Sequence, residues 1–406
     1  MRWKTILKHF GKAVLAILTA IILFYSFIIA ALSVTFQNAN GGIYIIVFMV
    51  MAILAELAMI GALWGFWKKK QFSIPILSGV GLCVLACVIL SGYQAHIDNI
   101  PTIGEREDLL AQYAPYAKDS KAVTLEDEST LTIAENLPVM DGATALYPIY
   151  ASFAKAVYPK EAIADIVTVE GDVTRIQKND FLMCNTTTEA YYNIVTGDAD
   201  IIFAALPSEE QKQFAQENGV ELVYTPIGKE AFVFFVNEKN PIKNLSVEEI
   251  QGVYSGAITE WETFGVKGFG KIKAFQRDKG SGSQSTLEKL MAGKTLMTPP
   301  QEDVIDGMGG IIQQTADYKN FKNALGYSFR FYATEMVQNN QIKLLCVNGI
   351  YPNLENIENG TYPLASSFYA VTRSDADENV LKLLEWITGK QGQKIVELAG
   401  YTPLES

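Results

Sequence analysis

The sequence predicts an α/β protein in two parts, with three transmembrane helices followed by a two-lobed soluble domain. Three long apolar runs fill the first hundred residues, and from about residue 131 short apolar strands alternate with amphipathic helices. The charge changes between the two parts, because residues 1–100 carry a net charge of +5 and the other 306 carry −16, giving −11 overall. We expect a membrane region over residues 1–95, an extracytoplasmic linker over 96–130 and a soluble domain over 131–406.

Three segments are long and apolar enough to cross a hydrocarbon core of about 30 Å. They cover about residues 13–36, 43–67 and 72–93, and only the second contains a charged residue, Glu56. Basic residues precede the first segment and separate the second from the third (Lys68-Lys69-Lys70), whereas the loop 37–42 is uncharged. The positive-inside rule therefore predicts a multi-pass membrane protein with a cytoplasmic N-terminus and an extracytoplasmic soluble domain.

Other interpretations of the apolar N-terminus remain. A cleaved signal peptide also begins with basic residues, but its apolar run is shorter than the one seen here. Cys87 follows Leu85-Ala86 as a lipidated cysteine would, although it lies deep within the third segment. Glu56 is expected either to contact a partner subunit or to pack in its neutral form inside the three-helix bundle.

The composition excludes several functions for the soluble domain. Its acidic charge excludes nucleic acid as a partner, since phosphate backbones are bound by basic surfaces. Both histidines, His9 and His96, belong to the N-terminal region, so histidine-based catalysis and histidine-ligated zinc are not expected in the domain. Cys184 and Cys346 lie in apolar runs and are expected to be buried free thiols. We expect no cofactor, no metal site and no enzymatic activity.

The elements of the soluble domain follow from its hydrophobic periodicity, and their alternation indicates mainly parallel sheets. Strands are expected at 137–140, 166–169, 182–184, 201–204, 231–237, 272–275, 324–329 and 366–372. Helices are expected at 147–157, 189–195, 208–218, after residue 283 and within 377–399. Capping boxes are expected at Thr186 with Glu189 and at Ser208 with Gln211. One lobe would comprise 131–232 and 328–406 and the other 238–324, with the strand 231–237 as a hinge.

Three strand-to-helix turns are expected to bind an oxyanion. They are Asp141–Ala145, Asn185–Thr188 and Arg277–Ser283, and each places small or hydroxyl-bearing residues where a helix begins. Free N–H groups at a helix start, together with the helix dipole, attract an anion. Arg277 adds a planar guanidinium that can contact two oxygens at once. A single turn of this kind is usually only a cap or a loop, so the prediction depends on all three together.

Four motifs carry a resemblance to a known family. They are Gly142-Ala143-Thr144 followed by Tyr147-Pro148-Ile149-Tyr150, the loop Arg277–Ser283, the stretch Tyr254–Trp261, and Ala324–Ser328. On these motifs, residues 137–400 resemble the periplasmic phosphate-binding proteins of phosphate ABC transporters, which have the type II solute-binding fold. The Arg277–Ser283 loop is the most specific of the four, with serine at 283 where the family has threonine. The family normally has a signal peptide or lipid anchor in place of the three spans.

The resemblance implies which groups would bind the ligand. They are Thr144 and the Ala145 N–H from the first turn, Thr187 with Thr186 from the second, and Arg277, Ser281, the Gly282 N–H and Ser283 from the third. The family also places an aspartate after the strand that matches residues 200–204, where it accepts the proton of hydrogen phosphate and so rejects sulfate. Here that position is Ala205, and Asp141, Glu189 or Glu230 could substitute for it.

The expected function is capture of phosphate, or a related oxyanion, between two lobes that close around it and present it to the permease subunits of an ABC transporter. Two other functions are considered. A membrane-bound sensor would use the same domain to report the ligand to a membrane partner. A phosphoester hydrolase would use Ser281 as its nucleophile, but no histidine is available in the domain to activate it.

Overall fold

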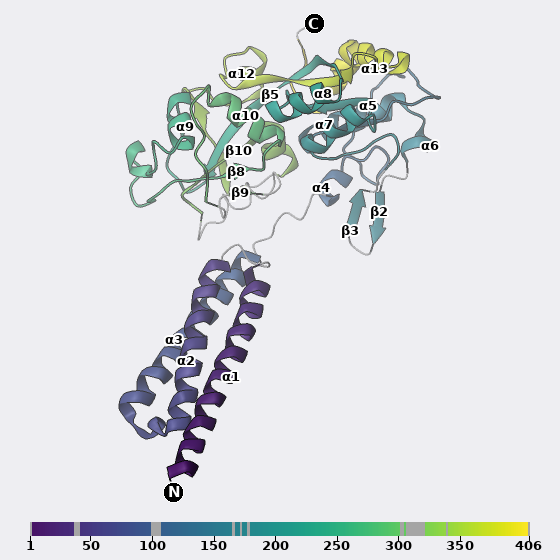
Figure 1. Ribbon diagram of the computed structural model, residues 1–406. Coiled ribbons are helices and arrows are strands. Elements are labelled where there is room, and N and C mark those ends of the chain that lie inside the picture. Colours follow the sequence, from purple (N-terminus) through teal and green to yellow (C-terminus); the bar gives the residue numbers. More distant parts are fainter. Residues whose placement is uncertain are drawn as a thin grey trace. The chain divides into compact units, whose positions relative to one another are not determined.

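The structure, a computed structural model, describes residues 2–35, 41–98, 107–164, 167–170, 173–176, 179–300, 304–305, 321–337 and 340–404. The contacts within the chain divide it into two compact units, Met1–Pro101 and Thr102–Ser406. Long helices make up the described part of the first unit, whereas the second combines helices with strands (Figure 1).

The first unit contains three long apolar helices, α1 (Arg2–Thr35), α2 (Gly41–Trp64) and α3 (Lys70–Asp98). Each is long and apolar enough to cross a membrane, over Ile6–Ser26, Ile46–Trp64 and Lys70–Ile89. The short 3-10 helix η1 (Phe66–Lys68) connects α2 to α3, which pack closely where Gly79 meets the side chain of Leu54. The three predicted helices are therefore confirmed, while their orientation in a membrane stays a prediction. The expected outer loop, 37–42, lies mostly outside the described residues.

The predicted linker is divided between the two units. Its residues 96–98 end helix α3, whereas its residues from 107 onward belong to the second unit. They begin with the short helix α4 (Glu107–Ala111) and bury Leu110, Ala111, Tyr113 and Ala114. Two hydrogen bonds of 2.9 Å attach the following residues to α5 (Tyr147–Val157), from the Val123 N–H to Ser152 Oγ and from Lys155 Nζ to the Ala122 carbonyl. The residues from 107 onward are thus part of the folded unit.

A seven-stranded sheet forms the centre of the second unit. Its strand order is β1-β4-β13-β5-β10-β7, and β11 also pairs with β5. The strands are β1 (Met140–Gly142), β4 (Ile201–Ala204), β5 (Leu222–Asn237), β7 (Lys273–Ala274), β10 (Ala324–Phe329), β11 (Ile342–Leu344) and β13 (Ala365–Arg373). Only the pairs β1–β4 and β10–β7 are parallel. The expectation of mainly parallel sheets is therefore wrong, because β13, β10 and β11 all run against the long strand β5.

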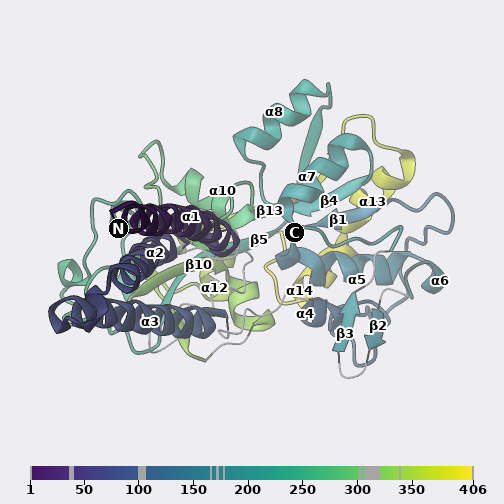
Figure 2. The same cartoon turned by 60° about the horizontal axis from the view of Figure 1, so that its bottom comes forward.

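The strand β5 connects the two halves of this sheet. Its residues 222–231 pair with β13, and residues 232–236 pair with β10. Figures 1 and 2 both show β5 passing between a group that contains α10 and β10 and a group that contains α5, α7 and α13. The strand begins nine residues before the predicted 231–237. The prediction is too short because Pro226 and Gly228 interrupt the pattern by which a strand is recognised in the sequence. The predicted lobe boundaries near 232 and 328 fall where β5 changes partner, although the division into lobes stays a prediction.

The helices of the second unit cover this sheet. Besides α4 and α5 they are α6 (Lys160–Ile163), α7 (Thr187–Thr196), α8 (Glu209–Glu217), α9 (Val247–Tyr254), α10 (Gly282–Leu290), α12 (Leu354–Glu358), α13 (Glu378–Thr388) and α14 (Lys390–Leu398). The predictions of α5, β4 and β10 are exact. The Ser208–Gln211 capping box is confirmed, and Thr186 Oγ1 accepts from the Glu189 N–H as predicted. Helix α9 is an element that the sequence analysis misses.

In the part of the chain that the structure describes, three pairs of short strands lie outside the main sheet. They are β2 (Val167–Glu170) with β3 (Val173–Ile176), β6 (Asn244–Leu245) with β12 (Cys346–Val347), and β8 (Gln276–Arg277) with β9 (Val304–Ile305). The strand expected at 182–184 is reduced to one bridge between Leu182 and Met140. Cys184 and Cys346 are not joined in a disulfide among the described residues, but both are partly exposed rather than buried, since each lies near the end of its apolar run.

Candidate functional site

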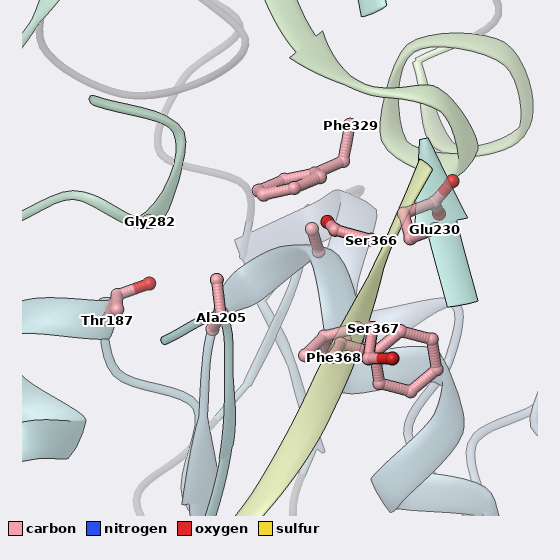
Figure 3. Close-up of a pocket in the computed structure, with 11 residues that line it drawn as sticks. Thr187, Ala205, Glu230, Gly282, Phe329, Ser366, Ser367 and Phe368 are labelled. Atoms are coloured by element: carbon pink, nitrogen blue, oxygen red, sulfur yellow. The ribbon is translucent and has the colours of Figure 1, made fainter. Parts of the chain in front are cut away.

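A small cavity lies beside β5, β10 and β13, next to the starts of α7 and α10 (Figure 3). Its volume is about 20 Å³. The lining residues come from both halves of the sheet and are Ala143, Ala145, Leu146, Thr187, Ala205, Glu230, Gly282, Phe329, Ser366, Ser367 and Phe368. A volume of this size suits a few atoms, such as a small ion or one or two water molecules.

Two helix N-termini border the cavity. Helix α7 begins at Thr187, and α10 begins at Gly282 behind Ser281, whose hydroxyl accepts from the Gln284 N–H at 3.3 Å. Figure 3 shows Thr187 next to Gly282, across from Phe329 and Ser366. The first N–H groups of a helix have no intrahelical acceptor and lie at the positive end of its dipole. Both helices therefore offer donors suited to an anion.

The turn before α10 contacts the turn before α7. The side-chain amide of Gln211, on α8, donates to the Gly280 carbonyl at 3.0 Å. Gly280 has a φ of +79°, and a Cβ there would lie 2.8 Å from Thr188 Oγ1. A Cβ on Gly282 would likewise lie 3.0 Å from Thr187 Oγ1. Only glycine permits such close approach, so these two glycines allow the turns to meet around the cavity.

The Asp141 carboxylate holds the first two turns together. Its Oδ1 accepts from the N–H groups of Gly142 at 2.8 Å and Asn185 at 2.9 Å, and its Oδ2 accepts from the amides of Asn185 at 2.9 Å and Asn193 at 2.8 Å. Asp141 is fully buried and does not line the cavity. These contacts give it a structural role and do not support it as the acceptor of a ligand proton.

The backbone of Arg277 is held by residues of α10 and β10. Its N–H donates to Gln284 Oε1 and to the Tyr327 hydroxyl oxygen, each at 3.0 Å. The Tyr327 hydroxyl in turn donates to Gln284 Oε1, and burial raises the pKa of Tyr327, which keeps that proton in place. The Arg277 Nε and Nη1 atoms are buried, although the side chain does not line the cavity.

Ser283 carries a buried hydroxyl in the first turn of α10. The residue is fully buried, and its Oγ has no hydrogen-bond partner among the described residues. A buried hydroxyl without a partner costs about 1–3 kcal/mol, so most such groups in proteins have one. Its position next to Gly282 makes Ser283 a candidate donor to a bound ligand.

The structure brings together some of the predicted site residues and not others. Ala145, Thr187 and Gly282 line the cavity, as does Ala205 at the position of the expected aspartate. Those outside the lining are Asp141, Thr144, Thr186, Arg277, Ser281 and Ser283. Within the described ranges, no group of three or more histidine, cysteine or acidic residues is placed to hold a metal ion. The ligand-binding role of each predicted residue stays a prediction.

Sequence analysis misses the part of the site that comes from β13. Ser366 and Ser367, near the start of this strand, line the cavity together with Phe329 at the end of β10. The sequence does contain a signal for them, since two consecutive serines are unusual in an otherwise apolar strand. That signal does not reveal that β13 passes the cavity, because this depends on its pairing with β5.

Among the described residues, Glu230 is the one acidic residue in the cavity lining. Its Oε1 accepts from the Ala231 N–H at 2.8 Å and its Oε2 from the Phe331 N–H at 3.3 Å. Burial raises the pKa of Glu230 to about 7, against the opposing effects of these two hydrogen bonds and of the Arg330 charge. Figure 3 shows its carboxyl group on the side of β13 away from Thr187 and Gly282. Glu189, another proposed substitute for the aspartate, is exposed and does not line the cavity.

Comparisons with known proteins match most of the soluble part. The family described as the PBP superfamily domain matches residues 128–391. The phosphate-binding protein PstS of Borreliella burgdorferi is 26% identical over 208 residues, which cover 50% of this chain and 70% of that protein. The phosphate-binding protein PstS of Bacillus subtilis is 25% identical over 215 residues, which cover 52% of this chain and 68% of that protein. The resemblance to phosphate-binding proteins is thereby confirmed.

A solved structure has the same fold. It is that of a putative phosphate ABC transporter substrate-binding protein with bound phosphate from Clostridium perfringens. The likeness has 23% identity and a TM-score of 0.51, and it covers 66% of this chain and all of that one. At this identity it shows the fold alone, and it confirms the predicted type II binding-protein fold.

Proposed function

The chain belongs to the PBP superfamily, and on this premise we propose that it is a membrane-anchored, extracytoplasmic solute-binding protein that captures phosphate or a related oxyanion. One observation carries the proposal, namely that the N-termini of α7 and α10 border one small cavity beside the buried Ser283 hydroxyl. The relatives named as phosphate-binding proteins support this class of ligand.

The neutral groups around the cavity are sufficient to bind an anion. Thr187 would donate a hydrogen bond from the start of α7, and backbone N–H groups would donate from the start of α10, which contacts it. Most residues of the lining are buried, and each hydrogen bond in such surroundings is stronger than in water, because the local dielectric constant is low. The negative charge of the domain as a whole is therefore compatible with anion binding.

The three helices of the first unit support a membrane location and a partner within the membrane. One carboxylate oxygen of Glu56, on α2, is buried without a hydrogen-bond partner among the described residues. Burial of this oxygen favours the alternative in which the neutral carboxyl group packs among the three helices, since a lone polar group in lipid is costly. We infer that the three helices bring the domain to the permease of an ABC transporter, to which it presents its ligand. A sensor subunit would use the same three helices.

The geometry gives no support to a hydrolase. Ser281, the expected nucleophile of that alternative, is the N-cap residue of α10, and its hydroxyl already accepts a hydrogen bond from the Gln284 N–H. Both histidines lie in the first unit. A serine without a general base is a weak nucleophile, so we infer binding rather than hydrolysis.

Titration calorimetry on the full chain in detergent micelles tests the proposed function. We expect one phosphate to bind per chain. We also expect Arg277→Ala to weaken binding by about a hundredfold, since the resemblance implies that this guanidinium pairs with the anion, although its side chain does not line the cavity. Arg373→Ala is the matched control, because Arg373 lies at the far end of β13 and pairs with exposed Asp375. Failure of phosphate, sulfate and organic oxyanions alike to bind would overturn the proposal.

A further inference from the structure

A larger groove adjoins the oxyanion cavity along β13. Its volume is about 300 Å³, compared with about 20 Å³ for the cavity. Ala205, Ser366 and Ser367 line both hollows. A ligand whose charged end occupied the cavity would therefore have the groove beside it, and small-molecule sites commonly have volumes of about 300–1,000 Å³.

The wall of this groove is largely apolar. Leu206, Leu290 and Leu364 contribute to it, together with the rings of Phe232 and Tyr369. Leu206 is 38% exposed although it directly follows Ala205 at the cavity. The one cation in the lining is Lys289, whose Nζ donates to the Leu206 carbonyl at 3.0 Å. The groove thus offers apolar surface to a ligand rather than a second charged site.

The cavity itself favours an oxyanion that has no hydroxyl hydrogen. Hydrogen phosphate carries one O–H group, which needs an acceptor once it is removed from water. Ala205 provides no carboxylate for this hydrogen, and Glu230 has its carboxyl group on the far side of β13, so the acceptors left are the neutral hydroxyls of the lining, Thr187, Ser366 and Ser367. A monoester or phosphonate has an organic group in place of that hydroxyl, and the methyl side chain of Ala205 leaves space for it.

We propose that the natural ligand is a phosphate monoester or a phosphonate with an apolar substituent, which lies in the groove while the oxyanion group occupies the cavity. This inference rests on the proposed function and specifies its class of ligand. The substituent packs against Leu206, Leu290 and Leu364.

The test compares four ligands by titration calorimetry on the full chain in micelles: inorganic phosphate, methylphosphonate, phenylphosphonate and phenyl phosphate. Both phenyl compounds should bind on the order of tenfold more tightly than inorganic phosphate, since burying a ring removes apolar surface from water. Tighter binding of phenylphosphonate would indicate a phosphonate as the ligand, and tighter binding of phenyl phosphate would indicate a monoester. Inorganic phosphate should compete with both, because its oxyanion group uses the same cavity.

Leu206→Ala tests the groove itself. It should weaken binding of the phenyl compounds about fivefold and leave inorganic phosphate and methylphosphonate unchanged. Leu381→Ala, at a leucine on α13 that is 53% exposed and outside the groove, should change neither. Phosphate binding that equals or exceeds that of the phenyl compounds would overturn this inference and leave the proposed function intact. Absence of binding by all four ligands would overturn both.

Discussion

Gln211 and Gly280 are joined by a hydrogen bond of 3.0 Å that connects α8 to the turn before α10. The same side chain also completes the capping box of its own helix, because its Oε1 accepts from the Ser208 N–H at 2.9 Å. The two halves of one amide thus have separate roles. The oxygen stabilises the start of α8, and the NH₂ group holds the turn before α10 against α8.

This division of roles makes Gln211→Glu an informative substitution. A glutamate keeps the oxygen that caps α8, but it replaces the donor to Gly280 with a negatively charged acceptor that repels the carbonyl. We expect oxyanion binding to weaken by about 2 kcal/mol in titration calorimetry and the melting temperature of the ligand-free protein to fall as well, because the repulsion is present without ligand. Gln216→Glu, at an exposed position of the same helix, is the control for the added charge.

Ser283→Ala should separate binding from stability. The Ser283 hydroxyl is buried without a partner, so its removal should leave the ligand-free protein as stable as before or slightly more stable. If this hydroxyl donates to the ligand, affinity should fall by about 1–2 kcal/mol. Paired measurements of the melting temperature with and without phosphate would reveal both effects.

Ser285→Ala is a matched control for that experiment. Ser285 lies two residues further along α10, and its hydroxyl is also buried without a partner among the described residues. Two residues along a helix change the direction of a side chain by roughly 200°. Equal loss of affinity in both variants would therefore contradict a direct contact between Ser283 and the ligand.

The sequence was sufficient to predict the local elements and the loops with special chemistry. Hydrophobic periodicity predicts α5 and β4, and the spacing of Ser208 and Gln211 predicts the capping box of α8. These features depend on neighbouring residues only. The turn Arg277–Ser283 was recognisable for the same reason, because glycine and serine before a helix are local signals. Thr187 and Gly282 accordingly appear both in the prediction and in the cavity lining.

Strand directions and the β13 side of the site required three-dimensional information. Pro226 and Gly228 interrupt the pattern of β5, so the sequence predicts only the last part of this strand. Its neighbours β10 and β13 are predicted in the right places, but they are antiparallel to β5 and not parallel as expected. Ser366 reaches the cavity through its pairing with Glu230, a partner 136 positions away in the sequence. Such long-range pairing leaves no trace in local hydrophobic periodicity.

Gly280→Ala should disturb both the backbone and the contact between the two turns. An alanine at a φ of +79° costs about 1–2 kcal/mol, and its Cβ would also meet Thr188 Oγ1 at 2.8 Å. Gly219→Ala provides the comparison, because Gly219 has a φ of +68° but open space around its Cβ position. We expect both variants to lower the melting temperature and only Gly280→Ala to weaken ligand binding. Normal affinity of Gly280→Ala would show that the close approach of the turns is not needed.

The pKa of Glu230 predicts how the stability of the second unit depends on pH. Burial raises this pKa from 4.5 to about 7, so the folded state favours the neutral carboxyl group. Its stabilising contribution is fully present below pH 4.5, where the group is neutral in both the folded and unfolded states, and is lost as the pH rises through about 7. The loss should be on the order of 3 kcal/mol, which thermal unfolding of the full chain between pH 5 and pH 8 would detect.

Glu230→Gln identifies the source of this pH dependence. Glutamine cannot ionise, so the variant should lose most of the fall in melting temperature between pH 5 and pH 8. Its amide keeps one acceptor for the N–H groups of Ala231 and Phe331, so we expect it to be less stable than the wild type at pH 5. Glu238→Gln, at an exposed residue just beyond β5, should retain the wild-type profile. An unchanged profile in Glu230→Gln would assign the pH dependence to other groups and show that Glu230 is ionised throughout this range.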